Sequence, residues 1–440
     1  MSTLKVNKLR DTAGSADAIV LDPNGGAVLA GVTTVTSVKV GAAVTISESG
    51  IDAVGLGITC ANINGGQIGG RRRISINGDM IIAQRANSAS VSDGSNEGYS
   101  TVDRWYVLHS SSAGGVATWS QDSDVPTDYS WGRFSKSLKA DVTTADTSIA
   151  SNHAITLQYR IEAQDIRNSG WDYTNPNSTL SVSFWAKSVK AGTYCVALHT
   201  HDGTVADIVK EYTLVANTWK HVELEFPGNS GLTIDDNNGA GLTVLWALQV
   251  GSDRQLDAGT TWTTRSGEGK YGSSNQVNFY DSTDNNFYLT GVQIEVGKAT
   301  IFEHRSFGEE LSLCQRYYYT DYKTTGFGDF TTGGNSAVIG YAVAYSSSEV
   351  FYIPQFPIVM RDTPTVKQGN ASYGLYIKRA SNGDRYIHGG GWSSINGGKK
   401  SVRMYAVTGG TQLDGGVTEG QTYPIHANSG NVYLAFDAEL

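Results

Sequence analysis

Cysteine, long apolar runs and a secretion signal are scarce or absent in this sequence of 440 residues. The three cysteines, Cys60, Cys195 and Cys314, lie far apart, and this spacing suggests neither a zinc cluster nor a disulfide framework. No run of about 18 apolar residues occurs, and the charged first residues carry no apolar signal segment. We therefore expect a protein that is made in the cytoplasm and is not inserted into a membrane.

Charged residues are also few, at 17% of the chain, and the acidic ones prevail. The 42 Asp and Glu residues against 33 Lys and Arg give a formal net charge of -9. A protein that binds nucleic acid needs basic side chains in excess to displace counterions from the phosphates. The sequence therefore predicts that nucleic acid is not a partner.

Proline is rare, with 8 residues, whereas glycine is abundant, with 52. Thr, Ser and Asn fill many polar positions, which is typical of sheets joined by tight turns rather than of helices rich in Glu and Lys. A chain of this length is also too long for one ordinary core. We expect an all-β protein with several domains.

Aromatic residues are missing from the first part of the chain, where the first one is Tyr99. Glycines and β-branched residues alternate there instead, as in 31–40 and 41–49. Strands of this size cannot bury their own apolar face, but copies of them can pack across a symmetry axis. Region 1–70 is therefore predicted to form an intertwined β shaft in a homotrimer; a disordered leader is the alternative.

From residue 71 onwards the composition changes, and eight of the nine tryptophans fall between Trp105 and Trp262. Apolar and polar residues alternate in several runs, which predicts strands that turn one face to a core and the other to solvent or a partner. The clearest runs are 155–161, 180–186, 222–226 and 242–250. Residues 71–306 are predicted to form a jelly-roll β-sandwich.

One helix is predicted between two β regions. Ser306 and Glu309 form a capping box, and apolar residues then recur with helical spacing up to Tyr318. This predicts a connecting helix over 307–319. The remaining residues, 320–440, are predicted to form a C-terminal β-sandwich head with its clearest strands at 342–345, 402–406 and 432–436.

Six segments carry a family resemblance: Met1–Leu9, Gly31–Thr36, Ile46–Ala53, Val292–Gly297, Phe302–Leu311 and Leu313–Tyr319. Together they resemble the tail fibre proteins of bacteriophages, especially those of marine and cyanobacterial phages. The specific part of the resemblance is the stretch from Val292 to Tyr319. In that family this stretch ends a β-sandwich that resembles carbohydrate-binding modules, and Ser181–Ala186 matches a typical inner strand.

The resemblance implies a homotrimeric fibre in the phage virion. Its N-terminus would join tail, baseplate or adaptor proteins, and its C-terminal part would meet polysaccharide or lipopolysaccharide on the host surface. Phage proteins are made in the host cytoplasm and leave by lysis, which would explain the missing secretion signal. Whether the fibre sits on the tail or the capsid stays open.

No catalytic motif was found, so we expect an adhesin that is not an enzyme. A tailspike-like depolymerase is the alternative and would need two opposed carboxylates, drawn from Asp122, Asp124, Asp128, Glu223 and Glu225. Glu223 and Glu225 alternate with apolar residues, which favours an ordinary strand surface. A purely structural virion fibre is the third hypothesis.

No cofactor is expected, although two patterns resemble metal sites. His199 and His201 could meet a transition metal on a threefold axis, but surface histidines are the favoured interpretation. Loops 122–124, 235–236 and 281–284 could hold calcium, although Asp and Asn also simply form turns. The basic run 71–73 is interpreted as forming salt bridges between subunits.

The receptor site is predicted in the head, at Trp392, Tyr386, His388, Asp384 and Arg385. Three glycines precede Trp392, so its indole is expected to be exposed and to stack on a sugar ring. Asp384 and Arg385 would orient hydroxyls or an acidic sugar. The alternative is that Trp392 packs across the trimer axis as a core anchor.

Overall fold

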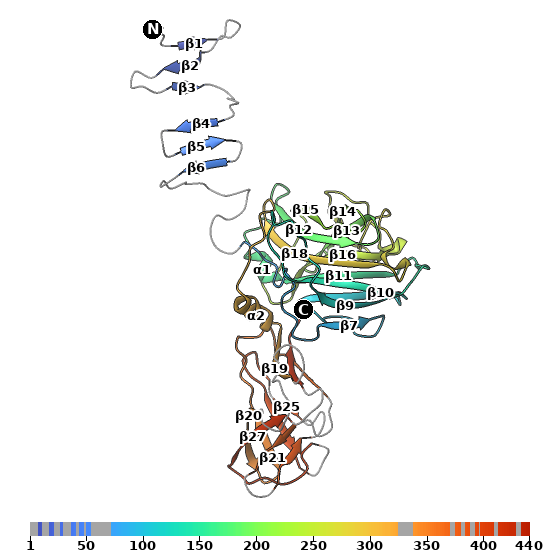
Figure 1. Cartoon of the computed structure of the whole chain (residues 1–440), viewed down its shortest axis with the longest axis vertical. Helices are drawn as coiled ribbons and strands as arrows, with labels where there is room; N and C mark the ends of the chain where they lie inside the picture. The colour runs from blue at the N-terminus through green and yellow to red at the C-terminus, as the bar shows by residue number, and fades with distance from the viewer. Residues whose placement is uncertain are drawn as a thin grey trace. The chain divides into compact units, whose positions relative to one another are not determined.

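The computed structural model describes residues 72–323, 338–369, 375–379, 383–387, 392–395, 397–408, 412–427 and 433–440, together with six short strands before residue 54. The chain divides into two compact units, Met1–Ala61 and Asn62–Leu440. The strands within each unit pair in antiparallel fashion, so the predicted all-β class is confirmed (Figure 1).

The first unit contains two three-stranded antiparallel sheets, in the orders β1-β2-β3 and β4-β5-β6. The strands are β1 (Lys8–Arg10), β2 (Asp17–Leu21), β3 (Ala27–Leu29), β4 (Ser37–Val40), β5 (Val44–Ser47) and β6 (Gly50–Ala53). Short strands were predicted for this region and are present; the segments between them lie outside the described residues. The intertwined trimeric shaft stays a prediction.

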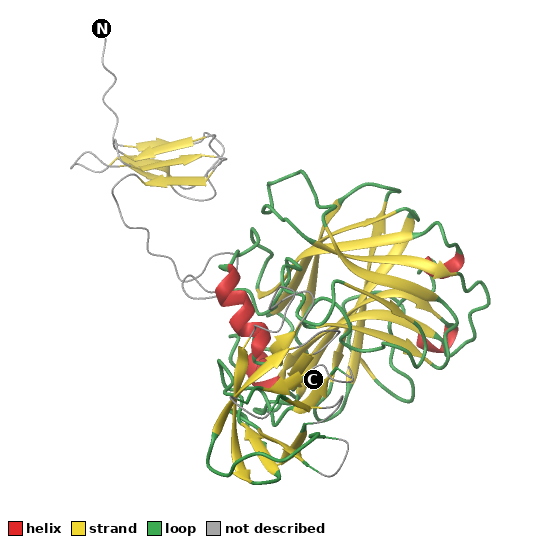
Figure 2. Ribbon diagram, turned by 60° about the horizontal axis from the view of Figure 1, so that its bottom comes forward, coloured by secondary structure: helices red, strands yellow, loops and turns green. Residues whose placement is uncertain are grey.

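A β-sandwich makes up the first part of the second unit, and Figure 2 shows its two layers of strands. One sheet has the order β15-β12-β18-β10-β9-β7 and the other β17-β14-β13-β16-β11-β8. The strands are β7 (Ser88–Val91), β8 (Trp105–Ser110), β9 (Val116–Asp122), β10 (Ser137–Thr144), β11 (Ala154–Glu162), β12 (Thr179–Ser188), β13 (Gly192–Thr200), β14 (Ala206–Leu214), β15 (Lys220–Pro227), β16 (Ala240–Val250), β17 (Thr263–Thr264) and β18 (Asn286–Val296).

Apolar alternation places the core between these two sheets, as predicted. Leu180, Val182 and Phe184 of β12 are completely buried there. Trp105 and Trp246 join them, with ring centroids 5.4 Å apart. Aromatic rings of this size supply much of the apolar area that stabilises a core.

The opposite face of β12 is also buried, which the alternation did not predict. Ser181 and Ser183 are 1% and 2% exposed, and the hydroxyl of Ser181 donates to the carbonyl of Gly297. Trp185 packs beside them against Phe302, in the segment that follows β18. The expectation that this face meets solvent or a partner is therefore wrong, because the chain covers it itself.

The second sheet is covered on its outer face in a similar way. Cys195, Ala197 and Leu245 lie on that face and are completely buried. Tyr271, from the segment between β16 and β18, packs against them. This segment includes η1 (Ser252–Arg254) and η2 (Phe279–Asp281), and a further short helix, α1 (Ala163–Arg167), follows β11. Much of the outer surface of the sandwich is thus closed by its own loops.

Helix α2 (Phe307–Gln315) begins where the capping box predicted. The side chain of Ser306 accepts a hydrogen bond of 3.3 Å from the backbone N–H of Glu309. The predicted end at residue 319 is wrong, because Tyr318 already belongs to strand β19 of the head. Among the described helices, none is both long and apolar enough to cross a lipid bilayer.

The basic run before the sandwich forms ion pairs within the chain. Arg72 lies 3.2 Å from Glu295, and Arg73 pairs with Glu310 of α2 in a contact where both side chains are almost fully buried. The backbone N–H of Asn77 also donates to Glu310. The interpretation that this run joins subunits is therefore wrong for Arg72 and Arg73, because their carboxylate partners lie in the same chain; Arg71 lies outside the described residues.

Asp79 lies beside this cluster, and burial raises the pKa of its carboxyl from 3.8 to about 6. The folded protein therefore favours the neutral form of Asp79. The contribution of this neutral carboxyl to the stability of the fold is complete below pH 4 and is lost as the pH rises through 6. We expect Asp79→Asn to raise the free energy of unfolding at pH 7 by about 2–3 kcal/mol. At pH 4 the variant and the parent should differ little. Denaturant titrations at both pH values check this, and an equal effect at both would contradict it.

The head consists of a three-stranded sheet, β19-β28-β22, and a seven-stranded sheet, β24-β23-β27-β20-β21-β26-β25. Apolar residues of both sheets form one core, so the predicted β-sandwich head is confirmed. The strands are β19 (Tyr318–Lys323), β20 (Val338–Ser346), β21 (Glu349–Tyr352), β22 (Thr365–Gln368), β23 (Leu375–Ile377), β24 (Arg385–Ile387), β25 (Ser393–Ile395), β26 (Arg403–Val407), β27 (Thr422–Ala427) and β28 (Tyr433–Asp437).

Candidate functional site

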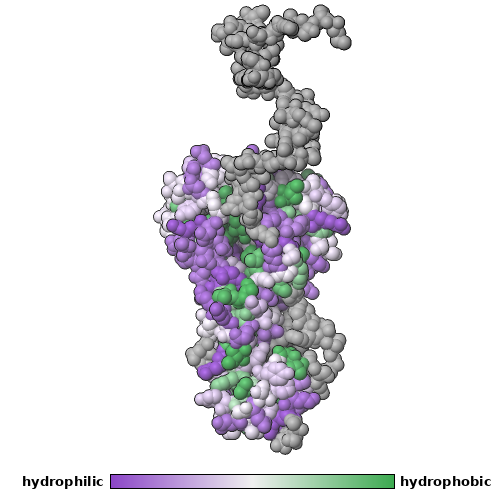
Figure 3. Space-filling model, turned by 90° about the vertical axis from the view of Figure 1, so that its left-hand side faces the viewer, coloured by the Kyte–Doolittle hydropathy of each residue, from purple (hydrophilic) through white to green (hydrophobic). Residues whose placement is uncertain are grey.

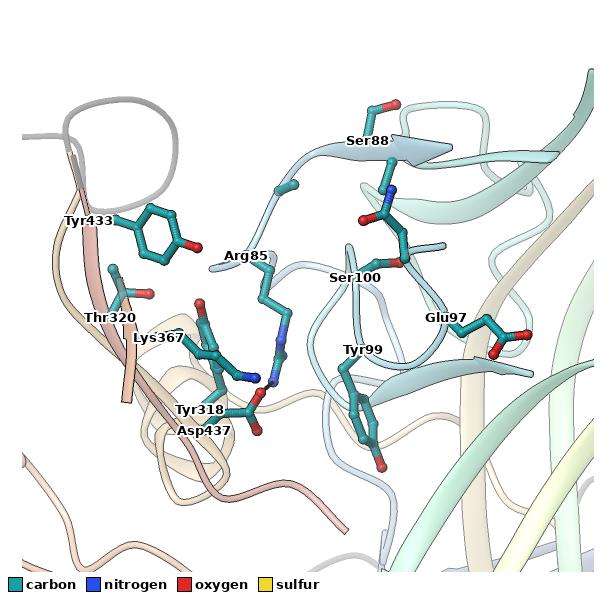
Figure 4. A pocket seen from close by; sticks show the side chains of 13 residues that line it. Arg85, Ser88, Glu97, Tyr99, Ser100, Tyr318, Thr320, Lys367, Tyr433 and Asp437 are labelled. Carbon is teal, nitrogen blue, oxygen red and sulfur yellow. Dashed lines mark ion pairs between the residues drawn. The ribbon is translucent and has the colours of Figure 1, made fainter. Parts of the chain in front are cut away.

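A groove of about 630 Å³ lies where the edge of the sandwich at strand β7 meets the three-stranded sheet of the head. Figure 4 shows Arg85 of the sandwich side and Lys367 and Tyr433 of the head side pointing toward one another, whereas Ser88, Glu97 and Tyr99 point away from the head. The lining of the groove combines tyrosines with hydroxyl, amide and charged groups. The lining residues are Arg85, Ala86, Ser88, Ala89, Asn96, Glu97, Tyr99, Ser100, Tyr318, Thr320, Lys367, Tyr433 and Asp437.

Strand alternation positions the head side of the groove. Leu434 and Phe436 of β28 point into the head core and are completely buried. Tyr433 and Asp437 therefore lie on the opposite face of the strand, which faces the groove. Lys367 of β22 pairs with the central residue of β28 in the sheet register, and this places its side chain on the same face.

The sandwich side comes from residues 85–100, which surround β7. The backbone of Gly98 exchanges hydrogen bonds of 2.9 and 3.0 Å with Val107 of β8. This pairing holds the next residue, Tyr99, edge-on against Tyr106 at 5.1 Å between ring centroids. The groove wall is thereby anchored to the sandwich rather than carried on a free loop.

Arg85 connects the two sides of the groove. Its guanidinium lies 3.7 Å from the centroid of the Tyr318 ring. It also lies 3.7 Å from Asp437 and 3.2 Å from Glu439, both in the C-terminal segment. Burial alone lowers the pKa of Arg85, but the carboxylates around it, Glu439 first, raise the pKa overall. Arg85 therefore stays charged and fixes the geometry of the groove floor.

Asp103 is the third carboxylate near Arg85, at 3.7 Å. Burial raises the pKa of Asp103 to about 6, although Arg85 and the Gln84 amide oppose this shift. Glu97, at the groove edge, also has a raised pKa because of burial, and its carboxylate accepts a 3.0 Å hydrogen bond from the backbone N–H of His109. The groove thus mixes cationic and acidic groups and carries no large excess of either sign.

Lys367 and Tyr433 are side chains of the groove that a ligand can reach. Lys367 is exposed and forms no ion pair within the described part of the chain. The hydroxyls of Ser100 and Thr320 find no hydrogen-bond partner among the described residues, but both oxygen atoms are buried and are not open to a ligand. Tyr433 is half-buried, so part of its ring faces the groove. The arrangement can therefore bind a polyhydroxylated molecule by combining ring contacts with directed hydrogen bonds.

Trp392, the centre of the predicted receptor site, is only 3% exposed. It packs into the head core with its ring centroid 5.7 Å from that of Tyr352, and its carbonyl accepts a 2.8 Å hydrogen bond from Gln368. The expectation of an exposed indole is wrong, because the glycines before Trp392 do not prevent its burial within its own domain. That domain core, rather than a contact between subunits, holds the ring.

The other predicted receptor residues lie at strand β24. The backbone N–H of Tyr386 donates to Asp414 at 3.0 Å, and Asp384 and Arg385 precede it, partly exposed. His388 lies outside the described residues. None of the four described residues lines the groove, so their role as a receptor site stays a prediction.

The carboxylates considered for catalysis differ in their hydrogen-bond partners and in their exposure. Asp124 pairs with Lys187 and accepts a 3.0 Å hydrogen bond from the Trp219 indole. Burial opposes ionisation of Asp124, but these hydrogen bonds outweigh it and lower its pKa. Asp128 accepts a backbone hydrogen bond from Ser130 in an exposed turn, whereas Asp122 accepts one from Asp124. Glu223 and Glu225 are exposed on β15, as the alternation predicted.

The residues considered for metal binding are held by protein groups. His199 contacts the Lys270 carbonyl at 2.8 Å, and His201 contacts the Thr243 hydroxyl at 2.7 Å. Burial lowers the pKa of both imidazoles to about 4, so they are neutral at pH 7. In the described part of the chain, no three His, Cys, Asp or Glu side chains gather as a metal site would require. Calcium in the loops stays an open expectation.

Arg85, Lys367 and Tyr433 were missed by the sequence analysis. They are isolated in the sequence, and no local motif marks them. Tyr318 lies in the stretch that carries the family resemblance, but its helical spacing from Cys314 assigned it only to a helix. The groove arises from segments more than 200 residues apart, so a single sequence held no signal for it.

No family model matches the chain, and no curated protein matches it. Among solved structures, it is similar to a family 4 carbohydrate-binding module at 13% identity, over 51% of this chain and 99% of that one, with a TM-score of 0.27. It is also similar to a family 22 carbohydrate-binding module of Clostridium thermocellum Xyn10B at 14% identity, over 45% of this chain and 88% of that one, with a TM-score of 0.24. A protein from Bacteroides thetaiotaomicron that is described as a candidate sugar-binding protein is similar at 10% identity, over 52% of this chain and 100% of that one, with a TM-score of 0.28. TM-scores this low carry no argument about what this chain binds.

Proposed function

We propose that the protein is an adhesin that binds cell-surface glycans in the groove between sandwich and head, without cleaving them. The observation that carries this proposal is the lining of the groove, where Tyr99 and Tyr433 accompany the exposed Lys367 ammonium. Sugars present hydroxyls at their edges and C–H groups on their faces, so a mixed lining of this kind suits them.

The balance of charge in the groove favours neutral or weakly acidic glycans. Lys367 can bind a hydroxyl or a sugar carboxylate, whereas Arg85 is already engaged by Asp437 and Glu439. A single shallow site of this kind binds weakly. Several copies on one particle would raise the effective affinity through multivalency.

The biological setting that we propose is a phage tail fibre, and the sequence resemblance supports it. The first unit, Met1–Ala61, would join the virion through tail, baseplate or adaptor proteins. The chain would assemble as a homotrimer and present its glycan sites to polysaccharide or lipopolysaccharide of the host. A depolymerase and a purely structural fibre remain the alternative functions.

Removal of the Lys367 ammonium should weaken glycan binding. We expect Lys367→Ala to lower the affinity for the glycan selected from an array of bacterial surface polysaccharides by roughly tenfold, because a charge-assisted hydrogen bond is lost. The measurement is calorimetry with the full-length chain. Tyr433→Ala should weaken binding as well, with an unchanged thermal midpoint in both cases.

Lys399→Ala is the matched control, because Lys399 is an exposed lysine of the head that does not line the groove. Equal effects of Lys367→Ala and Lys399→Ala would reject the groove as the site. Release of new reducing ends from the bound glycan would favour the depolymerase. Light scattering on the same sample tests the trimer, which has a mass of roughly 140 kDa from three copies of 47.0 kDa.

A further inference from the structure

The seven-stranded sheet of the head exposes a row of aromatic and β-branched side chains. Tyr341, Val343 and Tyr345 of β20 are 63%, 47% and 64% exposed. Figure 3 shows apolar residues reaching the surface of the head among hydrophilic ones. Exposed large apolar groups that lie together, rather than singly, mark an interaction site.

Strand geometry explains why these side chains share one face. Ala342 and Ala344 of β20 are buried in the head core, so the residues between them point outward. Val343 pairs with Phe351 of β21 in the sheet register. We call the group Tyr341, Val343, Tyr345, Phe351 and Arg403 the aromatic platform.

Contacts within the aromatic platform hold the rings of Tyr345 and Phe351 in place. The rings of Tyr345 and Phe351 are stacked at 4.7 Å with an interplanar angle of 23°. The guanidinium of Arg403 lies 4.9 Å from the centroid of the Phe351 ring. Its Nε atom has no hydrogen-bond partner in the described part of the chain. The rings of Tyr345 and Phe351 and the Arg403 guanidinium are thus arranged before any ligand arrives, which reduces the entropy cost of binding.

The size of the platform indicates what it binds. Its exposed side chains offer on the order of 400 Å² of apolar surface. A stable contact between protein chains buries about 800 Å² per partner, so the platform is too small for a second copy by itself. Tyr341 and Tyr345 are four residues apart on one strand, or about 13 Å, and a short run of sugar rings can span that distance.

We propose that the aromatic platform is a second glycan-binding site, separate from the groove. Hydroxyl-rich sugar rings stack on Tyr345 and Tyr341, while Arg403 donates hydrogen bonds to ring hydroxyls or to a sugar carboxylate. The site lies on β20, β21 and β26, none of which lines the groove. Two separate sites on one chain of this protein allow one glycan chain, or two neighbouring glycan chains, to be held at two points.

The test uses the full-length chain and a biotinylated polysaccharide that the parent protein binds on the array. We expect Tyr345→Ala to lower its affinity about three- to tenfold, and Tyr345→Phe, which keeps the ring, to restore most of it. The loss should add to that of Lys367→Ala in the double variant, because the two sites are separate. A loss of binding by Lys367→Ala with none by Tyr345→Ala overturns the platform while leaving the groove in place.

Tyr129→Ala is the control, because Tyr129 is a sandwich tyrosine that is 57% exposed and carries a cation beside its ring, as the platform does. It should bind like the parent. The molar mass of each variant is measured by light scattering. A smaller oligomer for Tyr345→Ala, with binding per chain unchanged, would overturn the proposal and assign this face to contacts between copies.

Discussion

Glu439→Ala should lower the free energy of unfolding by about 3–5 kcal/mol, as expected when one partner of a buried ion pair is removed. Glu439 pairs with Arg104, whose side chain is completely buried, and with Arg85 at 3.2 Å. An arginine cannot lose its proton to relieve a buried charge. Denaturant unfolding, followed by tryptophan fluorescence of the sandwich, measures the loss.

Two variants make this prediction specific. Glu439→Gln keeps the size of the side chain and part of its hydrogen bonding, so it should cost less than alanine. Glu419→Ala is the matched control, because Glu419 is exposed in the head and its loss should change the stability by less than about 0.5 kcal/mol. Equal stabilities of Glu439→Ala and Glu419→Ala would show that the buried pair contributes nothing.

The same substitution should also affect the groove. Arg85 lines the groove and is positioned by Glu439 together with Asp437. The backbone beyond Glu439 adds a 2.7 Å hydrogen bond from Arg160 to the Leu440 carbonyl. The C-terminal segment therefore connects the head to the sandwich through these contacts. The groove depends on them, because its two sides belong to the head and to the sandwich. Glycan binding should fall in Glu439→Ala even under conditions where both parts stay folded.

Local patterns predicted the parts of the fold that depend on local physics. In β12 and β16 the alternation of apolar residues has the period of a strand, and these residues do form the core. The capping box at Ser306 depends on one side chain and one N–H three residues later, so it too is readable in the sequence. The end of the helix could not be read from the sequence, because Tyr318 pairs with Asp437 and belongs to strand β19.

The groove could not be predicted from the sequence either, because it too depends on contacts between residues far apart in the chain. Arg85 acquires its role only when Tyr318 and Asp437 are brought to it from the other part of the unit. The burial of Trp392 depends on Tyr352 and the rest of the head core, whereas its neighbours in sequence are glycines that suggest exposure. Long-range packing overrides local composition at both places.

Glu310→Ala should be as damaging as Glu439→Ala, with a loss of about 3–5 kcal/mol in the free energy of unfolding. The carboxylate of Glu310 is buried and pairs with Arg73, while Arg305 lies 3.6 Å away. It also accepts a hydrogen bond from the Asn77 backbone N–H. Without the Glu310 carboxylate, the buried guanidinium groups of Arg73 and Arg305 remain close together and keep only weaker partners. Denaturant unfolding measures the difference from the parent.

Glu225→Ala is the control for this variant, because Glu225 is exposed on β15 and its loss should be nearly neutral. Arg73→Met in the Glu310→Ala background should recover part of the stability, since it removes one of the two uncompensated charges while keeping an apolar side chain of similar length. A double variant less stable than Glu310→Ala would contradict an electrostatic cause and would point to packing of Arg73 on Phe302 instead, where the guanidinium lies 4.6 Å from the ring centroid. Recovery would establish that helix α2 is held to the start of the sandwich chiefly by charge.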